Sequence, residues 1–338
     1  MPDATAGIAL LVVAGVMNAS FTIPMKFTKK WAWENTWAVW SVYALLILPP
    51  LIAYLTVPNL GTVYSQAGMK AVVLVALCGF AWGIAQVLFG LAVDSIGVAL
   101  AFAIVLGLSA AIGSLIPLIQ LHPDKIFTPA GLGVVTGVVL VVAGVSVCAI
   151  AGHKREKAAG TERHSKMSFS TGLACAILSG LGAAAMNFGV AFGGAVINSA
   201  KATGTNPAWS INAVWFPLMV AGAIPSLVYC FYLMRKNNTS GNFSISGTGS
   251  YWGLAAIMAL FWFVSTIMYG VASGKLGELG PVLGWPFFMS LIVIMASVMG
   301  GLTGEWKNAG KTPVRVQIAG VTLLVIAVVV LSRAGQYV

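Results

Sequence analysis

The sequence predicts an all-α polytopic membrane protein with ten transmembrane helices in two inverted five-helix repeats. One observation is composition, because 59% of the 338 residues are hydrophobic and only 8% are charged. A soluble domain needs more charge than this to cover its surface. A second is that apolar runs of about 20 residues, the length that spans bilayer hydrocarbon, recur along the whole chain. The third is an internal repeat.

The repeat is clearest between residues 78–105 and a segment 180 positions later, where five identical or similar pairs align: Trp82 with Trp262, Phe89 with Tyr269, Gly90 with Gly270, Ala92 with Ala272 and Gly97 with Gly277. Residues 7–15 likewise resemble 172–180, and 127–142 resemble 311–326. The halves are therefore 1–152 and 169–338, joined by the charged linker 153–168. Each half has five spans, and an odd number turns the second copy upside down in the membrane.

Helices are expected rather than strands, because the apolar runs are long and lack the period-2 alternation of a membrane barrel. A short turn is expected at Asp94 and Ser95, between the third and fourth spans. Prolines within spans predict kinks, above all Pro281 and Pro286 on either side of Trp285. The expected spans are about 5–27, 36–57, 69–92, 95–120, 128–151, 169–198, 207–233, 250–274, 276–302 and 313–334.

The distribution of Lys and Arg predicts the orientation. Loops after odd-numbered spans hold 13 of these residues, and the other side, termini included, holds 5. Because basic loops stay in the cytoplasm, we expect the linker to be cytoplasmic and both termini periplasmic, in a bacterial inner membrane. This bias accounts for the net charge of +10. The positive charge therefore implies membrane lipid as a partner and does not imply nucleic acid.

No nucleotide-binding loop, dinucleotide fingerprint, HExxH or GxSxG motif is found in the sequence. We therefore expect neither an enzyme nor an ATP-driven pump, and no metal or cofactor. Cys78, Cys148, Cys175 and Cys230 lie in apolar segments and are expected to be buried thiols rather than disulfides or metal ligands. A secondary transporter is the class that remains.

Polar side chains inside spans are costly in lipid, so they should face the protein interior or a cavity. Taken alone, each amide is equally consistent with helix packing, and each aromatic is more typical of the core or of the interfacial belt. Together they provide what a sugar needs, which is ring stacking and fixed partners for hydroxyl groups. The candidate substrate-binding residues are Asn18, Trp82, Gln86, Asn187, Asn212, Trp215, Trp262, Tyr269 and Trp285.

A proton-coupled carrier needs a carboxyl group that titrates with access to both sides. Glu278 and Asp94 occupy equivalent regions of the two repeats, and we expect both near the outer face. Glu34 lies at the mouth of the second span beside Lys29 and Lys30. We expect these cations to favour its charged form and make it the poorer carrier.

Two loop motifs are specific enough to indicate a family. The motif residues are Phe21, Pro24, Lys26, Lys29, Lys30, Trp31, Trp33 and Glu34 in the first loop, Trp82, Trp262 and Tyr269 in the spans, and Glu305, Trp306, Asn308, Ala309, Gly310, Pro313 and Val314 near the end. In these residues, and nearly end to end, the chain resembles the bacterial L-rhamnose–proton symporters, which belong to the drug/metabolite transporter superfamily. The resemblance implies ten spans, two inverted halves, outward termini and uptake of a sugar with a proton.

The chain departs from that family in its spans. Ser265 stands where the family has Gln, Gln86 replaces an Asn and Trp215 replaces a Tyr, and residues 279–281 replace a Gln-Tyr-Asp run. An intramembrane acid is thereby absent. The expected function is import of a small neutral sugar, L-rhamnose or a related deoxyhexose, with a proton. The alternatives are an uncoupled uniporter or exchanger for another sugar or polyol, a drug or metabolite exporter, and a non-transporting sensor or assembly factor.

Overall fold

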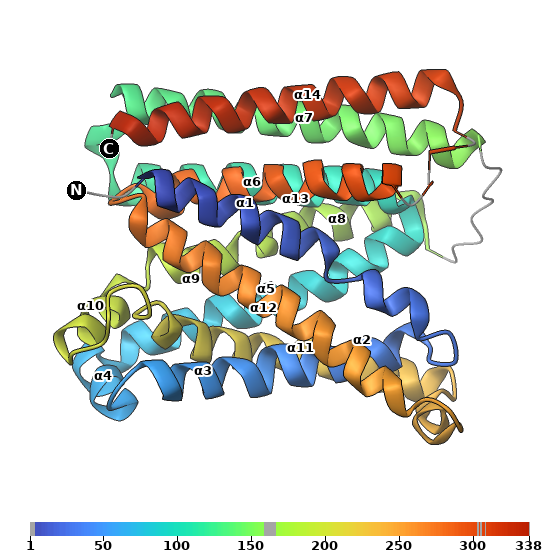
Figure 1. The fold of residues 1–338 in the computed structure, drawn as a ribbon, viewed down its shortest axis with the longest axis horizontal. Helices are drawn as coiled ribbons and strands as arrows, with labels where there is room; N and C mark the ends of the chain where they lie inside the picture. The colour runs from blue at the N-terminus through green and yellow to red at the C-terminus, as the bar shows by residue number, and fades with distance from the viewer. Residues whose placement is uncertain (1–3, 159–166, 303, 305, 308, 338) are drawn as a thin grey trace.

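The computed structural model describes residues 4–158, 167–302, 304, 306–307 and 309–337 (Figure 1). All regular elements in these residues are helical. The first half contains α1 (Ala4–Ser20), η1 (Ile23–Phe27), α2 (Trp33–Ser41), the π-helix η2 (Val42–Ile47), α3 (Leu48–Thr56), α4 (Leu60–Ala67), α5 (Met69–Ile96), α6 (Val98–Leu121), η3 (Pro123–Lys125) and α7 (Pro129–Ala158). The second contains α8 (Phe169–Ala183), α9 (Ala185–Ala191), α10 (Gly194–Ala202), α11 (Asn212–Lys236), η4 (Ser240–Ser244), α12 (Gly249–Lys275), α13 (Gly280–Leu302), α14 (Lys311–Ala334) and η5 (Gly335–Tyr337).

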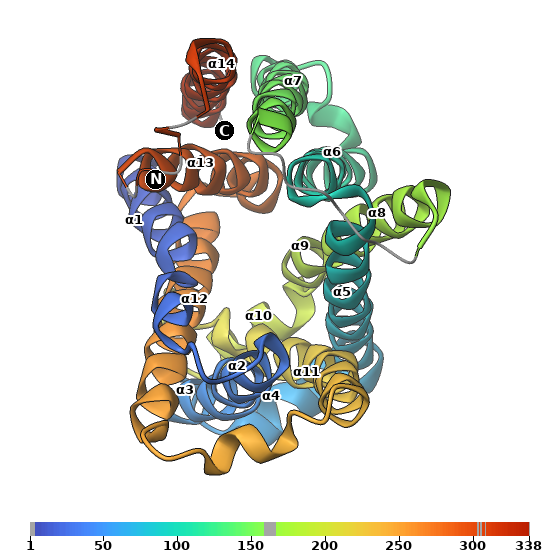
Figure 2. The same ribbon diagram turned by 90° about the vertical axis from the view of Figure 1, so that its right-hand side faces the viewer.

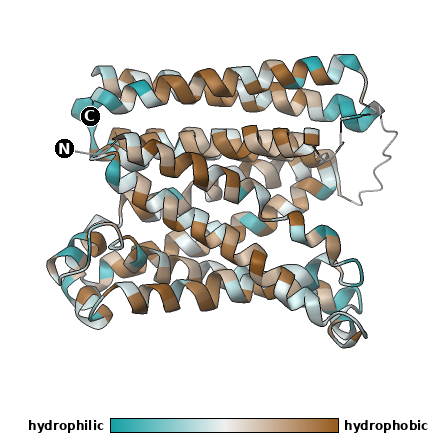
Figure 3. Ribbon diagram, viewed as in Figure 1, coloured by the Kyte–Doolittle hydropathy of each residue, from teal (hydrophilic) through white to brown (hydrophobic). Residues whose placement is uncertain are grey.

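Ten segments of the described chain are long and apolar enough to cross a membrane, which confirms the predicted number of spans. Apolar residues cover their length, while hydrophilic residues gather at the two ends (Figure 3). Large side chains on the outer surface are apolar too: Val139 and Val228 are 62% and 63% exposed. A surface of this kind is stable in lipid and not in water.

One predicted turn is misplaced. Asp94 and Ser95 lie in the last turn of α5, and the chain turns at Gly97 instead. Gly97 has φ +88° and its repeat partner Gly277 has φ +79°. Glycine adopts positive φ without a steric penalty, so it determines where the chain leaves the helix.

Two spans are discontinuous. The sixth, Phe169–Ala202, is divided into α8, α9 and α10 by breaks at Ala184 and at Phe192 and Gly193. The second contains a π-helical turn just before Pro49 and Pro50, because prolines lack the N–H groups that would continue the α-helical pattern. Irregular backbone at this depth is stable only where protein encloses it.

The spans form a ring when viewed from one end (Figure 2). On one side α1 packs against α12 and α13, on the other α5 packs against α8 and α11, and α7 pairs with α14 beside α6 and α13. Small residues permit the closest contacts. A Cβ atom on Gly79 of α5 would lie 1.9 Å from the carbonyl oxygen of Leu218 in α11, so these two backbones touch directly.

Candidate functional site

Asn187 of α9 lies at a junction of four helices. Its Nδ2 donates to the carbonyl oxygens of Gly113 in α6 at 2.7 Å and Pro281 in α13 at 3.0 Å. Its Oδ1 accepts the hydroxyl hydrogen of Tyr269 in α12. Both Asn187 and Tyr269 are fully buried. One amide therefore holds α6, α9, α12 and α13 together at the break in the sixth span.

Proline explains why the Gly113 carbonyl oxygen can accept from a side chain. Pro117 lies inside α6 and has no N–H to bond the carbonyl four residues earlier, which is that of Gly113. Pro286 inside α13 likewise frees the carbonyl of Val282, which accepts the Ser114 hydroxyl at 2.5 Å. Of the two prolines expected above all to distort a helix, Pro286 lies inside α13, whereas Pro281 lies in its first turn, where proline interrupts no helical hydrogen bond. Both freed acceptors bond a polar group of another helix.

The same arrangement recurs in the seventh span. Pro217 inside α11 frees the carbonyl of Ala213, and the Tyr64 hydroxyl of α4 donates to it at 3.0 Å. Pro225, also inside α11, frees the carbonyl of Ala221, for which no side-chain donor is found among the described residues.

Aromatic rings surround the Asn187–Tyr269 pair. Tyr269 stacks on Phe288 with ring centroids 5.2 Å apart and meets Trp285 edge-on at 5.4 Å. Trp215 lies 6.4 Å from the same ring. The Trp285 Nε1 donates to the Ser109 carbonyl oxygen at 2.9 Å. We call Asn187, Trp215, Tyr269, Trp285 and Phe288 the central cluster.

Several polar atoms at the edge of the central cluster are buried without a hydrogen-bond partner in the described structure. They are Trp215 Nε1, Ser109 Oγ and Ser273 Oγ. An unpaired buried polar group costs roughly 1–3 kcal/mol, so a group of them requires an explanation. Glycine allows close packing beside two of them: a Cβ on Gly270 would lie 3.0 Å from Trp215 Nε1, and one on Gly280 would lie 1.8 Å from the Ser273 carbonyl oxygen.

A second cluster lies two turns away along α12. Trp262 stacks on Trp82 of α5 at 5.6 Å and meets Trp40 of α2 edge-on at 5.2 Å. Nearby on α12, Ser265 accepts from Asn18 of α1 at 3.0 Å. We call Asn18, Trp40, Trp82, Trp262 and Ser265 the tryptophan cluster. Because Trp262 and Tyr269 are seven residues apart on α12, they share one face of the helix.

The structure therefore brings together seven of the nine predicted substrate-binding residues in two adjoining clusters. The other two lie apart. The Asn212 amide nitrogen donates to Thr56 Oγ1 at 3.0 Å, at the start of α11. Gln86 is half-buried in α5 and makes no hydrogen bond to another described residue. The sequence did not single out Ser109, Ser273 or Phe288. Two of them could have been found from helical spacing, because Ser273 is four residues after Tyr269 and Phe288 is three residues after Trp285.

The three predicted proton-coupling residues differ sharply in environment. Glu34 is 4% exposed, and its Oε1 accepts from Asn237 Nδ2 at 3.0 Å and Thr239 Oγ1 at 2.7 Å. Asp94 and Glu278 are both exposed. Of the acidic residues that the structure describes, Glu34 is therefore the one with a buried side chain.

The expectation that Asp94 and Glu278 share the outer face is wrong. Ser95, next to Asp94, donates to the Ser168 carbonyl oxygen at the linker end. Leu276, close to Glu278, packs near Gly7 and Gly335 at the end that holds both termini. Five spans separate the two acids along the chain, and an odd number of crossings places them at opposite ends (Figure 1).

Glu34 belongs to a contact between the loop that follows η1 and the loop that contains η4. We call this contact the η1–η4 interface and define it as residues 30–35 against residues 237–252. Lys30 Nζ donates to the Ser246 carbonyl oxygen at 2.8 Å, and Asn35 Nδ2 donates to that of Thr239 at 2.9 Å. Trp31 is 6% exposed and meets three aromatic rings edge-on, those of Phe243, Tyr251 and Trp252. The first loop of one half is thereby bound to the second half at the linker end.

A discontinuous span, carbonyls freed by proline and an enclosed cluster of amides and aromatic rings together define a polytopic helical transporter. The site contains neutral hydrogen-bonding groups and rings rather than charges. The chain belongs to the L-rhamnose-proton symport protein family, whose family model matches residues 2–335.

Curated relatives agree with this assignment. The L-rhamnose-proton symporter of Yersinia pestis (strain Pestoides F) is 28% identical over 328 residues, which cover 95% of each chain. The L-rhamnose-proton symporter of Escherichia coli O17:K52:H18 (strain UMN026 / ExPEC) is 27% identical over 330 residues, 96% of each chain.

Proposed function

We propose that this protein imports L-rhamnose, or a related deoxyhexose, together with a proton across the bacterial inner membrane by alternating access. The observation that carries the proposal is the central cluster, where buried amide, hydroxyl and indole groups adjoin aromatic rings at a broken span. Family membership and the names of the relatives support the same substrate. The protein acts as a transporter, with no catalytic role.

The chemistry of the central cluster suits a neutral sugar. An aromatic ring accepts the C–H face of a pyranose, and fixed polar groups pair with its hydroxyls. Trp215 Nε1 is a donor, whereas Ser109 Oγ and Ser273 Oγ both donate and accept, and all three lack partners. No charged side chain belongs to the cluster, which disfavours a phosphorylated or carboxylate substrate.

We infer that transport uses two inverted halves. The packing of corresponding helices supports this. In the repeat, α1 corresponds to α8, α5 to α12 and α6 to α13. The contacts of α5 and α6 with α8 are matched by contacts of α12 and α13 with α1. Residues aligned by the repeat also meet each other, since α7 packs on α14 and Trp82 stacks on Trp262. Rocking of one half against the other would open the central cluster first to one side and then to the other.

The orientation follows from loop charge. We infer that the end with the linker and the η1–η4 interface is cytoplasmic and that both termini are periplasmic, because 13 of the 18 basic residues lie in the loops at that end. The η1–η4 interface is then a cytoplasmic closure. Sugar release inward requires its contacts to separate.

We assign proton coupling to Glu34, which reverses the order expected from the sequence. Glu34 is hydrogen-bonded by neutral side chains rather than by the neighbouring cations, since Lys30 donates to the Ser246 carbonyl oxygen. As a carboxylate it accepts two hydrogen bonds from the opposite loop. Protonation converts one oxygen from an acceptor to a donor and thereby weakens the interface. Burial of the group and its position between the halves suit this role better than the exposed positions of Asp94 and Glu278.

Uptake into proteoliposomes tests the proposal. Purified protein is reconstituted, and labelled L-rhamnose uptake is measured with an inward proton gradient and without one. Accumulation above equilibrium that requires the gradient supports symport. Equilibration at the same rate under both conditions would establish the uncoupled uniporter instead. If L-rhamnose failed to compete with any transported sugar, the proposed substrate would be wrong, although the assignment of the fold would stand.

A further inference from the structure

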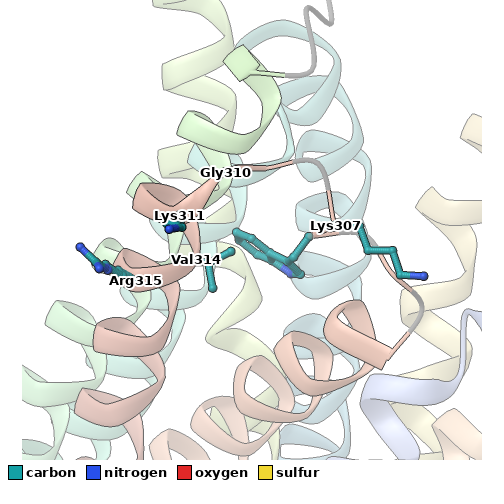
Figure 4. A pocket seen from close by; sticks show the side chains of 6 residues that line it. Lys307, Gly310, Lys311, Val314 and Arg315 are labelled. Atoms are coloured by element: carbon teal, nitrogen blue, oxygen red, sulfur yellow. The ribbon is translucent and has the colours of Figure 1, made fainter.

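A basic pocket lies outside both clusters, at the end of the molecule that holds the linker. It has a volume of about 400 Å³ and is lined by Trp306, Lys307, Gly310, Lys311, Val314 and Arg315, from the loop after α13 and the first turns of α14 (Figure 4). Three of these six residues are cationic. In the sequence, no acidic residue follows Glu305, which lies outside the described residues.

The elements around the pocket add further positive potential. The Arg155 guanidinium at the end of α7 lies over the Trp306 ring, 5.0 Å from its centroid. This cation–π contact joins the loop to α7 and places a fourth cation beside the pocket. In addition, α14 begins at Lys311 without a side-chain cap, so the N–H groups of Lys311 and Thr312 favour an anion, while Pro313 has none to offer.

Apolar surface continues directly from the pocket along the spans. Ile318, one turn beyond Val314 on the same face of α14, is 61% exposed, and Leu302 at the end of α13 is 78% exposed. An occupant with a negative headgroup and a hydrocarbon chain satisfies both surfaces. A soluble anion would use the charges and leave the apolar surface unoccupied.

We propose that this pocket binds the phosphodiester headgroup of an anionic membrane phospholipid, with an acyl chain along the exposed face of α14. Basic pockets between transmembrane helices recognise such headgroups, and an indole ring at the interface anchors the helix ends. The bound lipid would hold the α13–α14 loop against α7. This site is independent of the proposed sugar transport.

Nanodiscs test the proposal with the full chain. Thermal unfolding is followed in phosphatidylcholine discs and in discs that contain phosphatidylglycerol, and native mass spectrometry counts the lipids retained. We expect phosphatidylglycerol to raise the melting temperature of the wild type. In the double variant Lys311→Gln, Arg315→Gln the gain should disappear, and retention of phosphatidylglycerol should weaken at least about tenfold, since two charged contacts are lost.

The matched control is Lys70→Gln with Lys201→Gln, which removes two exposed cations at the opposite end and should keep the gain. The charge-preserving pair Lys311→Arg, Arg315→Lys should keep it too, which separates loss of charge from damage to the fold. An equal gain in the Lys311→Gln, Arg315→Gln variant would overturn the proposal. So would reproduction of the gain by inorganic phosphate in phosphatidylcholine discs, because the occupant would then be a soluble anion.

Discussion

Trp82 and Trp262 stack on each other with ring centroids 5.6 Å apart and planes inclined by 24°. They are also the two tryptophans that the internal repeat aligns, 180 positions apart. In the inverted repeat that we propose, two equivalent residues can touch only where they lie close to the axis that relates the halves. The tryptophan cluster is therefore the expected centre about which the halves move.

Removing either ring should weaken the contact between the halves. Trp82→Ala and Trp262→Ala should each lower the melting temperature, and the double variant should be less destabilised than their sum. We expect a coupling free energy of about 0.5–1.5 kcal/mol, the usual value for an aromatic pair. Thermal unfolding in detergent measures the stabilities of the wild type, the two single variants and the double variant, which together form a double-mutant cycle. Strict additivity would show that the stacking contributes nothing.

Tyr269→Phe removes one hydroxyl and leaves the ring and its stacking on Phe288 in place. The Asn187 Oδ1 then loses its donor, so sugar affinity should fall by about 1–3 kcal/mol, the cost of an unpaired buried partner. Titration of binding by tryptophan fluorescence measures this. The matched control is Tyr232→Phe on the outer surface of α11, where the side chain is 55% exposed. Equal affinities in both variants would remove Tyr269 from the site.

Pro117→Ala restores the N–H that α6 lacks at this position. The new donor competes with Asn187 for the Gly113 carbonyl and straightens the helix. We therefore expect unchanged or higher thermal stability together with roughly tenfold weaker sugar binding, a cost of about 1.4 kcal/mol. Pro225→Ala is the control, because no described side chain donates to the carbonyl that Pro225 frees. A variant that binds normally would show that the proline has only a structural role.

Glu34→Gln keeps the shape of the side chain and removes its titration. Accumulation driven by a proton gradient should be lost in proteoliposomes, while exchange of labelled for unlabelled sugar continues. Asp94→Asn and Glu278→Gln serve as controls and should still accumulate sugar, since both acids are exposed. Normal accumulation by Glu34→Gln would remove it as the carrier. If all three variants behave like the wild type and the wild type itself only equilibrates sugar, the protein is a facilitator.

Single cysteines test the orientation. With the four native cysteines replaced, Lys157→Cys at the linker end and Gln336→Cys near the C-terminus are labelled in intact cells with a membrane-impermeant maleimide. Both positions are exposed. We expect rapid labelling at 336 and protection at 157 until the membrane is permeabilised. The reverse pattern would invert the topology.

Composition and loop charge are local properties, so the sequence alone determined the class of fold and the number of spans. Periodic repetition also identified Trp82 with Trp262 and Gly97 with Gly277, because duplicated residues keep their spacing whether or not the chain is folded. The position of amides and aromatic residues inside apolar spans further selected most of the residues that form the two clusters. Most helix ends were predicted to within a few residues, but the fifth span continues to Lys157 instead of ending at 151, and the seventh begins at Asn212 instead of 207.

Only the tertiary structure decided how those residues combine. Which carbonyl a proline frees follows from the sequence, but which side chain donates to that carbonyl depends on the helix opposite, as for Asn187 and Gly113. The burial of Glu34 likewise arises from the loop some two hundred residues later that closes over it, and nothing next to Glu34 in the chain reveals it. Asp94 and Glu278 showed the converse, since similar positions in the two sequence repeats lie at opposite ends. Contacts between distant segments depend on packing in three dimensions, which a linear pattern does not encode.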